Sequence, residues 1–363
     1  MSSRVETVFS HCSSPVDAIM VKNGTAPILD ENFFYLTDFV SGVFEGCLAV
    51  AFPDGRVEAI VSELEAGSAR RGSVPVSVYR TRQEFKEILS GLLGSVFRVG
   101  INAAGLTVHD RDSLKQLLVK SEFVDVSAAF SSARLVKDAQ ELDRIRTACG
   151  IADRVVEALP DIIGEGMTEN ELAAEIDYCL LKEGAERPSF DTISSCGANT
   201  AEPHYGHGDV GLRSGELVLC DFGAQYRRYA SDVTRTWVLG SSSSQQREMY
   251  EVVLRAQQAA LDTVAAGVPS SVVDAAARKV IDGSAFKGRF IHSTGHSLGL
   301  AVHDGERLST ESSLVLQENM VFTVEPGVYL SGVGGVRIED DVRVTSRGCE
   351  VLSKAVKAFA EVG

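Results

Sequence analysis

Four carboxylates and one imidazole occupy short, distinctive stretches in the second half of this chain. They are Asp221, Asp232, His296, Glu325 and Glu339. An oxygen-rich ligand set of this kind suits a pair of divalent cations better than one structural zinc, which favours nitrogen and sulfur ligands. Two cations held about 3.5–4 Å apart can activate a bridging hydroxide and polarise a carbonyl group. The residue types therefore indicate the chemistry of a hydrolase.

The two aspartates accompany apolar stretches that are typical of strands. Asp221 follows the apolar run 217–220, and Asp232 lies within the β-rich stretch 229–239. Strand alternation places Asp232 on the same face as Thr234. An unpaired carboxylate is costly to bury, and carboxylates on neighbouring strands can converge on a metal. Taken alone, however, the two acids fit unrelated roles better, one ending a strand and one pairing with an arginine.

The two glutamates make the metal interpretation the stronger one. Glu325 ends the apolar run 322–324, and Glu339 ends a similar run at 336–338. Buried charges on strands are rare unless they are paired or coordinated. The alternative is an exposed pair between Arg337 and Glu339, which would contribute little stability. That alternative leaves unexplained why four acids end or interrupt four apolar strands.

Histidines gather in the same half of the chain. Five of the seven lie there, namely His204, His207, His292, His296 and His303. One imidazole would complete a two-metal site, and others would hydrogen-bond a substrate carbonyl or move protons near neutral pH. We expect the cluster at 292–303 to be functional. His207, in a polar loop, and the isolated His11 and His109 are expected to lie at the surface.

The composition is that of an ordinary globular protein. The chain has 363 residues, of which 44% are apolar and 23% charged, and this length favours two domains. It carries 35 basic and 50 acidic residues, a net charge of −15. This balance argues against a general affinity for nucleic acid or anionic membranes. No apolar run approaches the roughly 20 residues needed to span a bilayer.

The cysteines and the N-terminus bear on the compartment. Seven cysteines are present and none forms a CxxC pair, so reduced, mainly buried thiols are expected. Thiols of this kind indicate a reducing compartment. Residues 1–17 contain no apolar core of a signal peptide. A cytoplasmic enzyme is therefore predicted.

The chain divides by pattern into residues 1–133 and 134–363. In the first part, apolar runs at 47–52 and 57–61 are joined through Pro-Asp-Gly at 53–55, which predicts a β-hairpin in a small α/β domain. The second part alternates helical patterns with β-rich runs. It is predicted to be a domain of mixed helices and largely antiparallel sheet, which makes the fold class α+β.

Three helices can be predicted in the second domain. Asp138 with Glu141, and Thr168 with Glu171, have the spacing of capping boxes that open helices through about residues 159 and 180. Apolar residues follow each start at spacings of three and four. A third helix is predicted over 245–266, with Gly267 as its C-cap.

These motifs resemble those of the pita-bread metallopeptidases, specifically the prolidase and aminopeptidase P branch. The resemblance covers the whole chain. It rests on YLTDF at 35–39, DFGAQYRRYASDVTRT at 221–236, HSTGHSLGLAVHD at 292–304, FTVEPGVY at 322–329 and GGVRIEDD at 334–341. It implies a C-terminal pita-bread domain, of the creatinase/aminopeptidase type, preceded by a smaller creatinase-like α/β domain.

The resemblance also implies roles for individual residues. Two cations would be bridged by Asp232 and Glu339. Asp221 would complete the shell of one ion, and His296 and Glu325 that of the other. Catalytic roles fall to His204, His303 and Glu325, substrate binding falls to His292 and Arg337, and Thr234 would support the carboxylate of the bridging aspartate.

By the same resemblance, the chain is expected to hydrolyse the Xaa-Pro bond of dipeptides or short peptides with a metal-bridging hydroxide. Glu325 would act as general base and then general acid. Manganese or cobalt is the expected metal, with zinc or iron as alternatives, and a homodimer is the expected assembly. The chain departs from the family pattern at Ser297, where a glycine is common, and at Asp304, where glutamate is usual. Both changes affect the expected shape of the pocket.

Other functions remain open at this point. An Xaa-Pro aminopeptidase acting on longer peptides is the main alternative to a dipeptidase. Methionine aminopeptidases share the five ligands but normally lack the N-terminal domain. A non-catalytic pita-bread binding module, or the non-metal relative creatinase, would be expected to have lost ligands that this chain retains.

Overall fold

The structure, a computed structural model, describes residues 2–363. The chain separates into two compact units, Met1–Arg134 and Leu135–Gly363. Within the described residues, no helix is both long enough and apolar enough to cross a membrane.

A six-stranded sheet forms the centre of the N-terminal unit, in the order β4-β3-β2-β1-β5-β6. Its strands are β1 Ala18–Lys22, β2 Leu48–Ala51, β3 Val57–Ser62, β4 Val76–Tyr79, β5 Arg98–Ile101 and β6 Glu122–Asp125. Only β2 runs antiparallel to its neighbours. The predicted hairpin is therefore confirmed as β2–β3, and Gly55 in its turn has the positive φ, 85°, that favours glycine.

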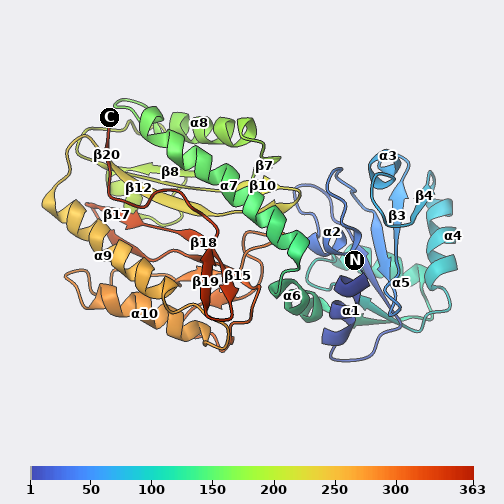
Figure 1. The fold of residues 1–363 in the computed structure, drawn as a ribbon. Helices are drawn as coiled ribbons and strands as arrows, with labels where there is room; N and C mark the ends of the chain where they lie inside the picture. The colour runs from blue at the N-terminus through green and yellow to red at the C-terminus, as the bar shows by residue number, and fades with distance from the viewer. Residues whose placement is uncertain (1) are drawn as a thin grey trace. The chain divides into compact units, whose positions relative to one another are not determined.

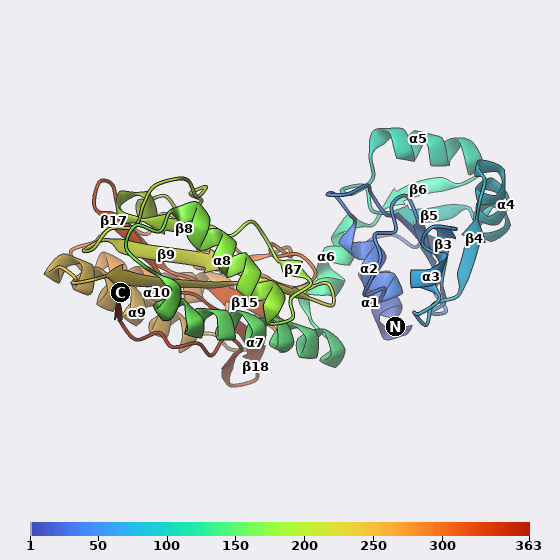
Figure 2. The same ribbon diagram turned by 90° about the horizontal axis from the view of Figure 1, so that it is seen from above.

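Helices cover both faces of this sheet. They are α1 Ser2–His11, α2 Glu31–Thr37, α3 Ala66–Ala69, α4 Arg82–Leu93, α5 Val108–Leu117 and α6 Ser127–Leu135. Alternate strand residues such as Ala18 and Met20 pack against Leu89 of α4 and Leu114 of α5. Helix α2 lies against the opposite face, so the sheet is sandwiched between α2 and α4 (Figures 1 and 2).

The C-terminal unit places two helix pairs on two sides of its strands. The helices are α7 Ala139–Ile162, α8 Glu169–Lys182, α9 Ser244–Leu261 and α10 Ser270–Asp282. α7 and α8 pack on one apolar core, and α9 and α10 pack on another. Figure 1 shows the two helix pairs on opposite sides of the strands. The mixture of helices with mainly antiparallel strands confirms the predicted α+β class.

Helix starts were predicted more accurately than helix ends. Both predicted capping boxes, at Asp138 and Thr168, are present. The third predicted helix was wrong at its C-terminus, because α9 ends at Leu261 and not at residue 266. Beyond it, the amides of Ala266 and Gly267 bond to carbonyls of distant segments and not to the helix. Helix α10 follows directly and was not predicted.

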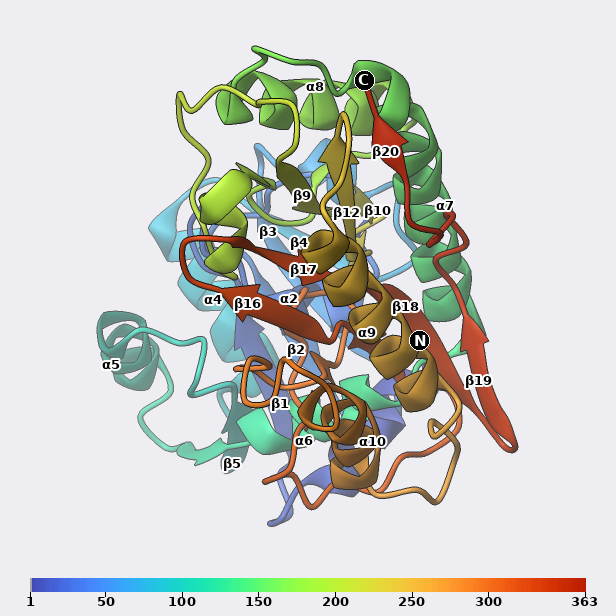
Figure 3. The ribbon, with the colours of Figure 1, turned by 90° about the vertical axis from the view of Figure 1, so that its left-hand side faces the viewer.

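Short strands connect the two helix pairs. They are β7 Arg187–Pro188, β8 Ile193–Cys196, β9 Leu217–Phe222, β10 Ala224–Tyr226, β11 Tyr229–Ala230, β12 Val233–Leu239, β13 Gly295–His296, β14 Arg307–Leu308, β15 Val321–Val324, β16 Gly327–Leu330, β17 Gly334–Arg337, β18 Asp340–Thr345, β19 Gly348–Val351 and β20 Glu361–Val362, with the short helix η1 at Gly197–Ala201. The main sheet has the order β20-β12-β9-β8, and β15-β18-β19 form a second sheet. β16 and β17 form a separate hairpin that contacts α9 (Figure 3).

Three of the β-rich stretches are interrupted at a candidate ligand. The stretch 229–239 was expected to be one strand, but it divides into β11 and β12 just before and after Asp232. The stretch 321–330 divides at Glu325, and the stretch after residue 334 divides at Glu339. At each break the chain leaves the regular alternation of a strand, so the acid is free to turn inward.

Candidate metal centre

One cavity of about 470 Å³ in the C-terminal unit collects the predicted site residues. Its lining includes Asp221, Asp232, His296, Glu325 and Glu339, together with His204, His292, His303 and Arg337. These nine side chains come from segments spread over residues 204–339, and the fold brings all of them together. His207 was expected to lie elsewhere, and it is exposed and bonds to Asn170.

Strand pairing places the two aspartates. Asp221 lies in β9 directly opposite Thr234 of β12, so Asp232 enters the cavity two residues before this pair. The amide of Asp232 donates to the Asp341 carboxylate at 2.9 Å. This bond holds the backbone at the strand break from the side away from the cavity.

A close approach of two backbone segments places His296 and Glu325. The Thr323 hydroxyl accepts from the His296 amide at 3.0 Å and donates to Glu325 Oε1 at 3.2 Å. A Cβ atom on Gly295 would lie 1.9 Å from the Thr323 carbonyl oxygen, so only glycine permits this approach. The result is that His296 Nε2 lies 3.5 Å from Glu325 Oε1 and 3.5 Å from Asp232 Oδ2.

Glu339 completes the group. Ligand atoms of Asp232, His296 and Glu339 all lie within 4.8 Å of one another. The Thr234 hydroxyl donates to Glu339 Oε2 at 2.5 Å. Thr234 was predicted to support the carboxylate of the bridging aspartate, and the contact instead goes to Glu339, because the strand break turns Asp232 away from its neighbour on the strand.

The donor set fits divalent cations. One carboxylate oxygen of Asp221 and one of Asp232 are buried and accept no hydrogen bond from any residue in 2–363. Burial and the neighbouring acids raise the pKa of Asp232 and of Glu339 well above the ordinary range. Burial also raises the pKa of Glu325 to about 7. Unshared oxygens and crowded negative charge are what bound cations would satisfy.

His296 is in the form that a metal ligand requires. Burial, followed by the nearby His303, lowers its pKa to about 3, so the imidazole is neutral. Nδ1 lies 3.4 Å from the Ser297 carbonyl oxygen, which assigns the proton to Nδ1. The lone pair of Nε2 then faces the carboxylates.

Arg337 is the fixed positive charge beside this cluster. Its guanidinium lies 2.5 Å from Asp221 Oδ2, and it donates to the Thr234 hydroxyl and the Tyr329 oxygen at 3.0 Å each. The alternative of an exposed pair between Arg337 and Glu339 was wrong. Both side chains are buried, 3% and 2% exposed, and Arg337 of β17 pairs with Asp221 of β9 in the main sheet.

Tyr329 links Arg337 to His292, and it was missed in the sequence. His292 Nδ1 lies 2.9 Å from the Ser293 carbonyl oxygen, so its Nε2 accepts from the Tyr329 hydroxyl at 2.8 Å. Burial lowers the pKa of His292 to about 4. The sequence did contain a signal for Tyr329, since this residue follows Glu325 by four positions in the stretch FTVEPGVY.

The remaining lining suits a substrate with a polar and an apolar side. His204 and His303 are exposed to solvent, and the ring of His303 meets that of His296 edge-on at 4.3 Å. Apolar side chains also line the cavity, and sequence reasoning did not identify them. They are Phe190, Ile193, Pro203, Ile291 and Val302.

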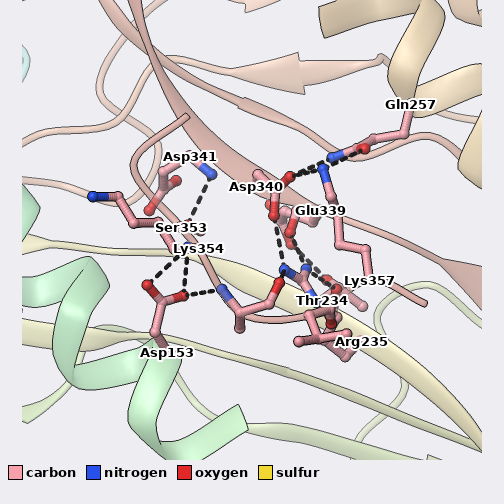
Figure 4. Close-up of polar contacts among 12 residues, drawn as sticks. Asp153, Thr234, Arg235, Gln257, Glu339, Asp340, Asp341, Ser353, Lys354 and Lys357 are labelled. Carbon is pink, nitrogen blue, oxygen red and sulfur yellow. Dashed lines mark hydrogen bonds and ion pairs between the residues drawn. The ribbon is translucent and has the colours of Figure 1, made fainter. Parts of the chain in front are cut away.

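A buried arginine supports the backbone behind the acids (Figure 4). Arg235 is 1% exposed and donates to the backbone oxygens of Thr234 and Glu339. It also donates to the carboxylate of Asp340 at 2.8 Å, whose other oxygen accepts from Gln257 at 2.7 Å. The residues flanking both candidate bridging acids are thereby held in one buried network.

The C-terminal segment closes the same network (Figure 4). The amide of Asp341 donates to Ser353 Oγ at 3.1 Å. The amides of Lys354 and Ala355 donate to the Asp153 carboxylate of α7 at 2.8–2.9 Å. Helix α7 therefore anchors the tail that lies against the strand after Glu339.

The structure accommodates the two departures from the family pattern without removing a ligand. Asp304 is buried, and its carboxylate lies 3.8 Å from the fully buried Lys137 ammonium. The Ser297 carbonyl oxygen accepts from the Asp304 amide at 2.8 Å. The Ser297 side chain is buried and does not line the cavity.

Comparisons with known proteins agree with this geometry. Residues 143–346 match the model of metallopeptidase family M24, and residues 12–136 match that of the creatinase/prolidase N-terminal domain. The chain is 39% identical to the Xaa-Pro dipeptidase of Pyrococcus horikoshii over 295 residues, 81% of this chain and 83% of that protein. Among solved structures, the prolidase from the same organism has a TM-score of 0.88 at 33% identity, with 99% of both chains covered. The X-Pro aminopeptidase from Thermotoga maritima has a TM-score of 0.91 at 29% identity, covering 99% of this chain and 100% of that one.

Proposed function

Because the chain belongs to metallopeptidase family M24, we propose that it hydrolyses the bond before proline in dipeptides or short peptides. The fold expected from the resemblance, a pita-bread domain preceded by a creatinase-like domain, is confirmed by the two family models and the solved structures. The observation that carries the proposal is the convergence of five metal-ligand side chains in one cavity that also has an apolar lining.

We assign the ligands from the donor chemistry of the cavity. Asp221, Asp232, His296, Glu325 and Glu339 would hold two divalent cations, which, when bound, lower the pKa of water and polarise the substrate carbonyl. Ligand atoms of Asp232, His296 and Glu339 lie within 4.8 Å of one another, so these three residues would be close enough to hold the same ion.

Glu325 is the proposed proton carrier. Its Oε1 lies 3.5 Å from His296 Nε2 among the other candidate ligands, where a carboxylate is close enough to take a proton from the attacking water and return it. In this role it accepts a proton from the attacking water and delivers it to the proline nitrogen as the peptide bond breaks. That nitrogen must gain a proton to leave as an amine, as in the cleavage of any peptide bond.

The other residues would orient the peptide. His204 and His303, exposed along the cavity, are placed to hydrogen-bond the substrate carbonyl and to stabilise charge that develops on it. Arg337 and His292, joined through Tyr329, form a preorganised polar side of the pocket. The proline ring would lie against the apolar lining.

A direct assay tests the activity. Purified protein supplied with manganese is expected to hydrolyse Ala-Pro, and Asp232→Asn is expected to abolish turnover while leaving the circular dichroism spectrum unchanged. The substitution keeps the shape of the side chain and removes the bridging charge. Turnover by Asp232→Asn equal to that of the unsubstituted protein would refute the site assignment.

The length of the substrate is the main alternative. The similarity to an X-Pro aminopeptidase structure supports activity on longer peptides, whereas two relatives from Pyrococcus species are Xaa-Pro dipeptidases. We propose the dipeptidase. The ratio of kcat/KM for Ala-Pro to that for Ala-Pro-Ala distinguishes the two activities, and a ratio below one would favour the aminopeptidase. Cleavage of Met-Ala without cleavage of either proline peptide would point to a methionine aminopeptidase.

Three further properties are proposed with the function. Manganese or cobalt is the expected metal, with zinc or iron as alternatives, because the ligand set alone does not select among divalent ions. Elemental analysis of protein purified without added metal tests this. A homodimer is expected from the family resemblance, and sedimentation velocity tests it. A cytoplasmic location accords with the seven free cysteines among the described residues.

A further inference from the structure

A second cavity, of about 360 Å³, lies within the N-terminal unit. It is lined by Lys22 at the carboxyl end of β1, by Tyr79 at the carboxyl end of β4, and by the facing sides of α4 and α5. Crevices outside the carboxyl ends of strands are the usual ligand sites of open, mostly parallel sheets. The cavity therefore occupies a position that suits binding, and the proposed peptidase activity makes no use of it.

Helical spacing brings positive charges to this cavity. Phe85 and Lys86 follow Arg82 by three and four residues, so all three share the face of α4 that lines the cavity. Lys22 and Arg80 also line it. In a chain of net charge −15, four cations and a single carboxylate, that of Asp110, around one cavity are a local reversal of sign.

Two of these cations have no acidic partner. Lys22 pairs with Asp110 at 2.7 Å, and Arg80 pairs with Glu63 at 2.9 Å. Arg82 and Lys86 form no ion pair with any described residue.

Their positions are also electrostatically unfavourable. Arg82 is the first residue of α4, where the helix dipole disfavours positive charge, and Lys86 is a like charge at i+4. A bound anion would offset both costs. Breaks in local rules of this kind are expected at functional sites.

Aromatic rings give the cavity its apolar part. Tyr79 and Phe85 lie edge to face with ring centroids 5.2 Å apart, and Leu114 and Leu117 of α5 line the same space. Both rings are partly exposed, so each has a surface available for contact. We propose that this cavity binds a small organic anion that combines an aromatic ring with a sulfonate, carboxylate or phosphate group.

Calorimetry with a matched pair of probes tests the proposal. Benzenesulfonate carries the ring and the charge and is a poor metal ligand, and methyl phenyl sulfone is its neutral counterpart. Benzenesulfonate is expected to bind the full-length protein, and the sulfone is expected to bind at least about tenfold more weakly. The double substitution Arg82→Gln with Lys86→Gln should weaken benzenesulfonate binding about tenfold, as expected for the loss of two partly screened charge contacts.

A control distinguishes binding in the cavity from a general effect of the net charge of the protein. Arg70→Gln with Lys120→Gln removes the same net charge from exposed positions of the same unit outside the cavity, and should leave binding unchanged. Ser113→Trp should block binding by filling the space between α4 and α5. Equal weakening in the control pair, equal affinity for the neutral sulfone, or binding retained in Ser113→Trp would each overturn the proposal. None of these outcomes depends on the peptidase assay.

Discussion

A single hydroxyl group joins the candidate acids to the arginine beside them. Thr234 Oγ1 donates to Glu339 and accepts from the Arg337 guanidinium, so its one proton and one lone pair hold both groups. Arg337 in turn bonds to Asp221. Charged side chains at such short distances could otherwise adopt several arrangements. The hydroxyl group favours one of these arrangements, because it hydrogen-bonds to both groups.

Substituting Thr234 should therefore weaken metal binding without removing a ligand. Thr234→Val keeps the shape of the strand but loses the hydroxyl, and manganese affinity is expected to fall about 10- to 100-fold. Thr234→Ser restores the hydroxyl and serves as the control. Titration of metal-depleted protein with manganese provides the measurement, and equal affinities in the valine and serine variants would contradict this role.

At the scale of elements, three of the candidate ligands stand at interruptions of strands, whereas Asp221 and His296 lie within β9 and β13. Asp232, Glu325 and Glu339 each separate two short strands. Because successive side chains in a regular strand point to opposite faces, a continuous strand would direct some of these acids into the apolar cores. The breaks turn them toward the cavity, and hydrogen bonds from neighbouring segments hold the interrupted backbone.

Arg235 is the main support of one such break, and its loss should be costly. It bonds to Asp340 and to backbone oxygens of Thr234, Glu339, Ala355 and Val356. Arg235→Met leaves those acceptors and part of the buried Asp340 charge uncompensated, so the free energy of unfolding should fall by about 3–5 kcal/mol.

The matched control for Arg235→Met is Arg247→Met. Arg247 forms an ion pair with Glu361 at 2.6 Å in the same unit, but its side chain is 50% exposed, so a loss below about 1 kcal/mol is expected. Urea unfolding of both variants provides the comparison. Similar losses in the two would contradict a supporting role for the buried network.

A second contact between elements gives a prediction about pH. Glu350 of β19 accepts from Arg146 of α7 and Arg343 of β18, and hydrogen bonds from Arg146, then from Arg343, lower its pKa. A lowered pKa stabilises the fold above the ordinary value and loses that stabilisation as pH falls through the folded value.

Glu350→Gln should therefore reduce the free energy of unfolding at pH 7, and by less at pH 3. Glu350 is 37% exposed, so solvent screening limits the loss at pH 7 to less than about 1 kcal/mol. Denaturant unfolding of both proteins at the two pH values gives the difference. A loss of the same size at pH 3 would show that packing, and not charge, is responsible.

At the scale of the whole molecule, the two units have separate apolar cores, one in the N-terminal unit and two in the C-terminal unit. The candidate metal ligands all lie in the C-terminal unit. Cations that bind the folded C-terminal unit should stabilise it by mass action. The gain is about 2.7 kcal/mol at a free metal concentration one hundred times the dissociation constant.

Calorimetric melting should reveal this coupling. Adding manganese to metal-depleted protein is expected to raise the transition of the C-terminal unit, and a chelator should reverse the rise. Asp232→Asn should remove the response. A rise of the same size in that variant would mean that manganese acts elsewhere on the chain.

Local patterns allowed much of this protein to be predicted. Capping boxes mark the starts of α7 and α8 because the residues that form them are three apart in sequence. The β2–β3 hairpin follows from its turn residues in the same way. The four candidate acids could be named for a related reason, since each one ends or interrupts an apolar run and a buried charge there requires a partner.

What required the tertiary structure were the partners themselves. The end of α9 depends on carbonyls of distant segments, and no local signal marks them. Arg337 is two residues from Glu339 in sequence, yet it pairs with Asp221, more than a hundred residues away. Thr234 was expected to contact Asp232, two residues away on the same strand. Its hydroxyl contacts Glu339 instead, because the regular strand is interrupted at Asp232.

Residue type and the cost of burying charge are local properties, so the amino-acid sequence is enough to name the side chains that react or bind metal. How those side chains meet depends on which strands pair and where they break, and this is visible only in the folded chain. The same division applies to the cavity of the N-terminal unit. Its four cations are plain in the sequence, but only the packing of α4 and α5 over the sheet brings them around one space.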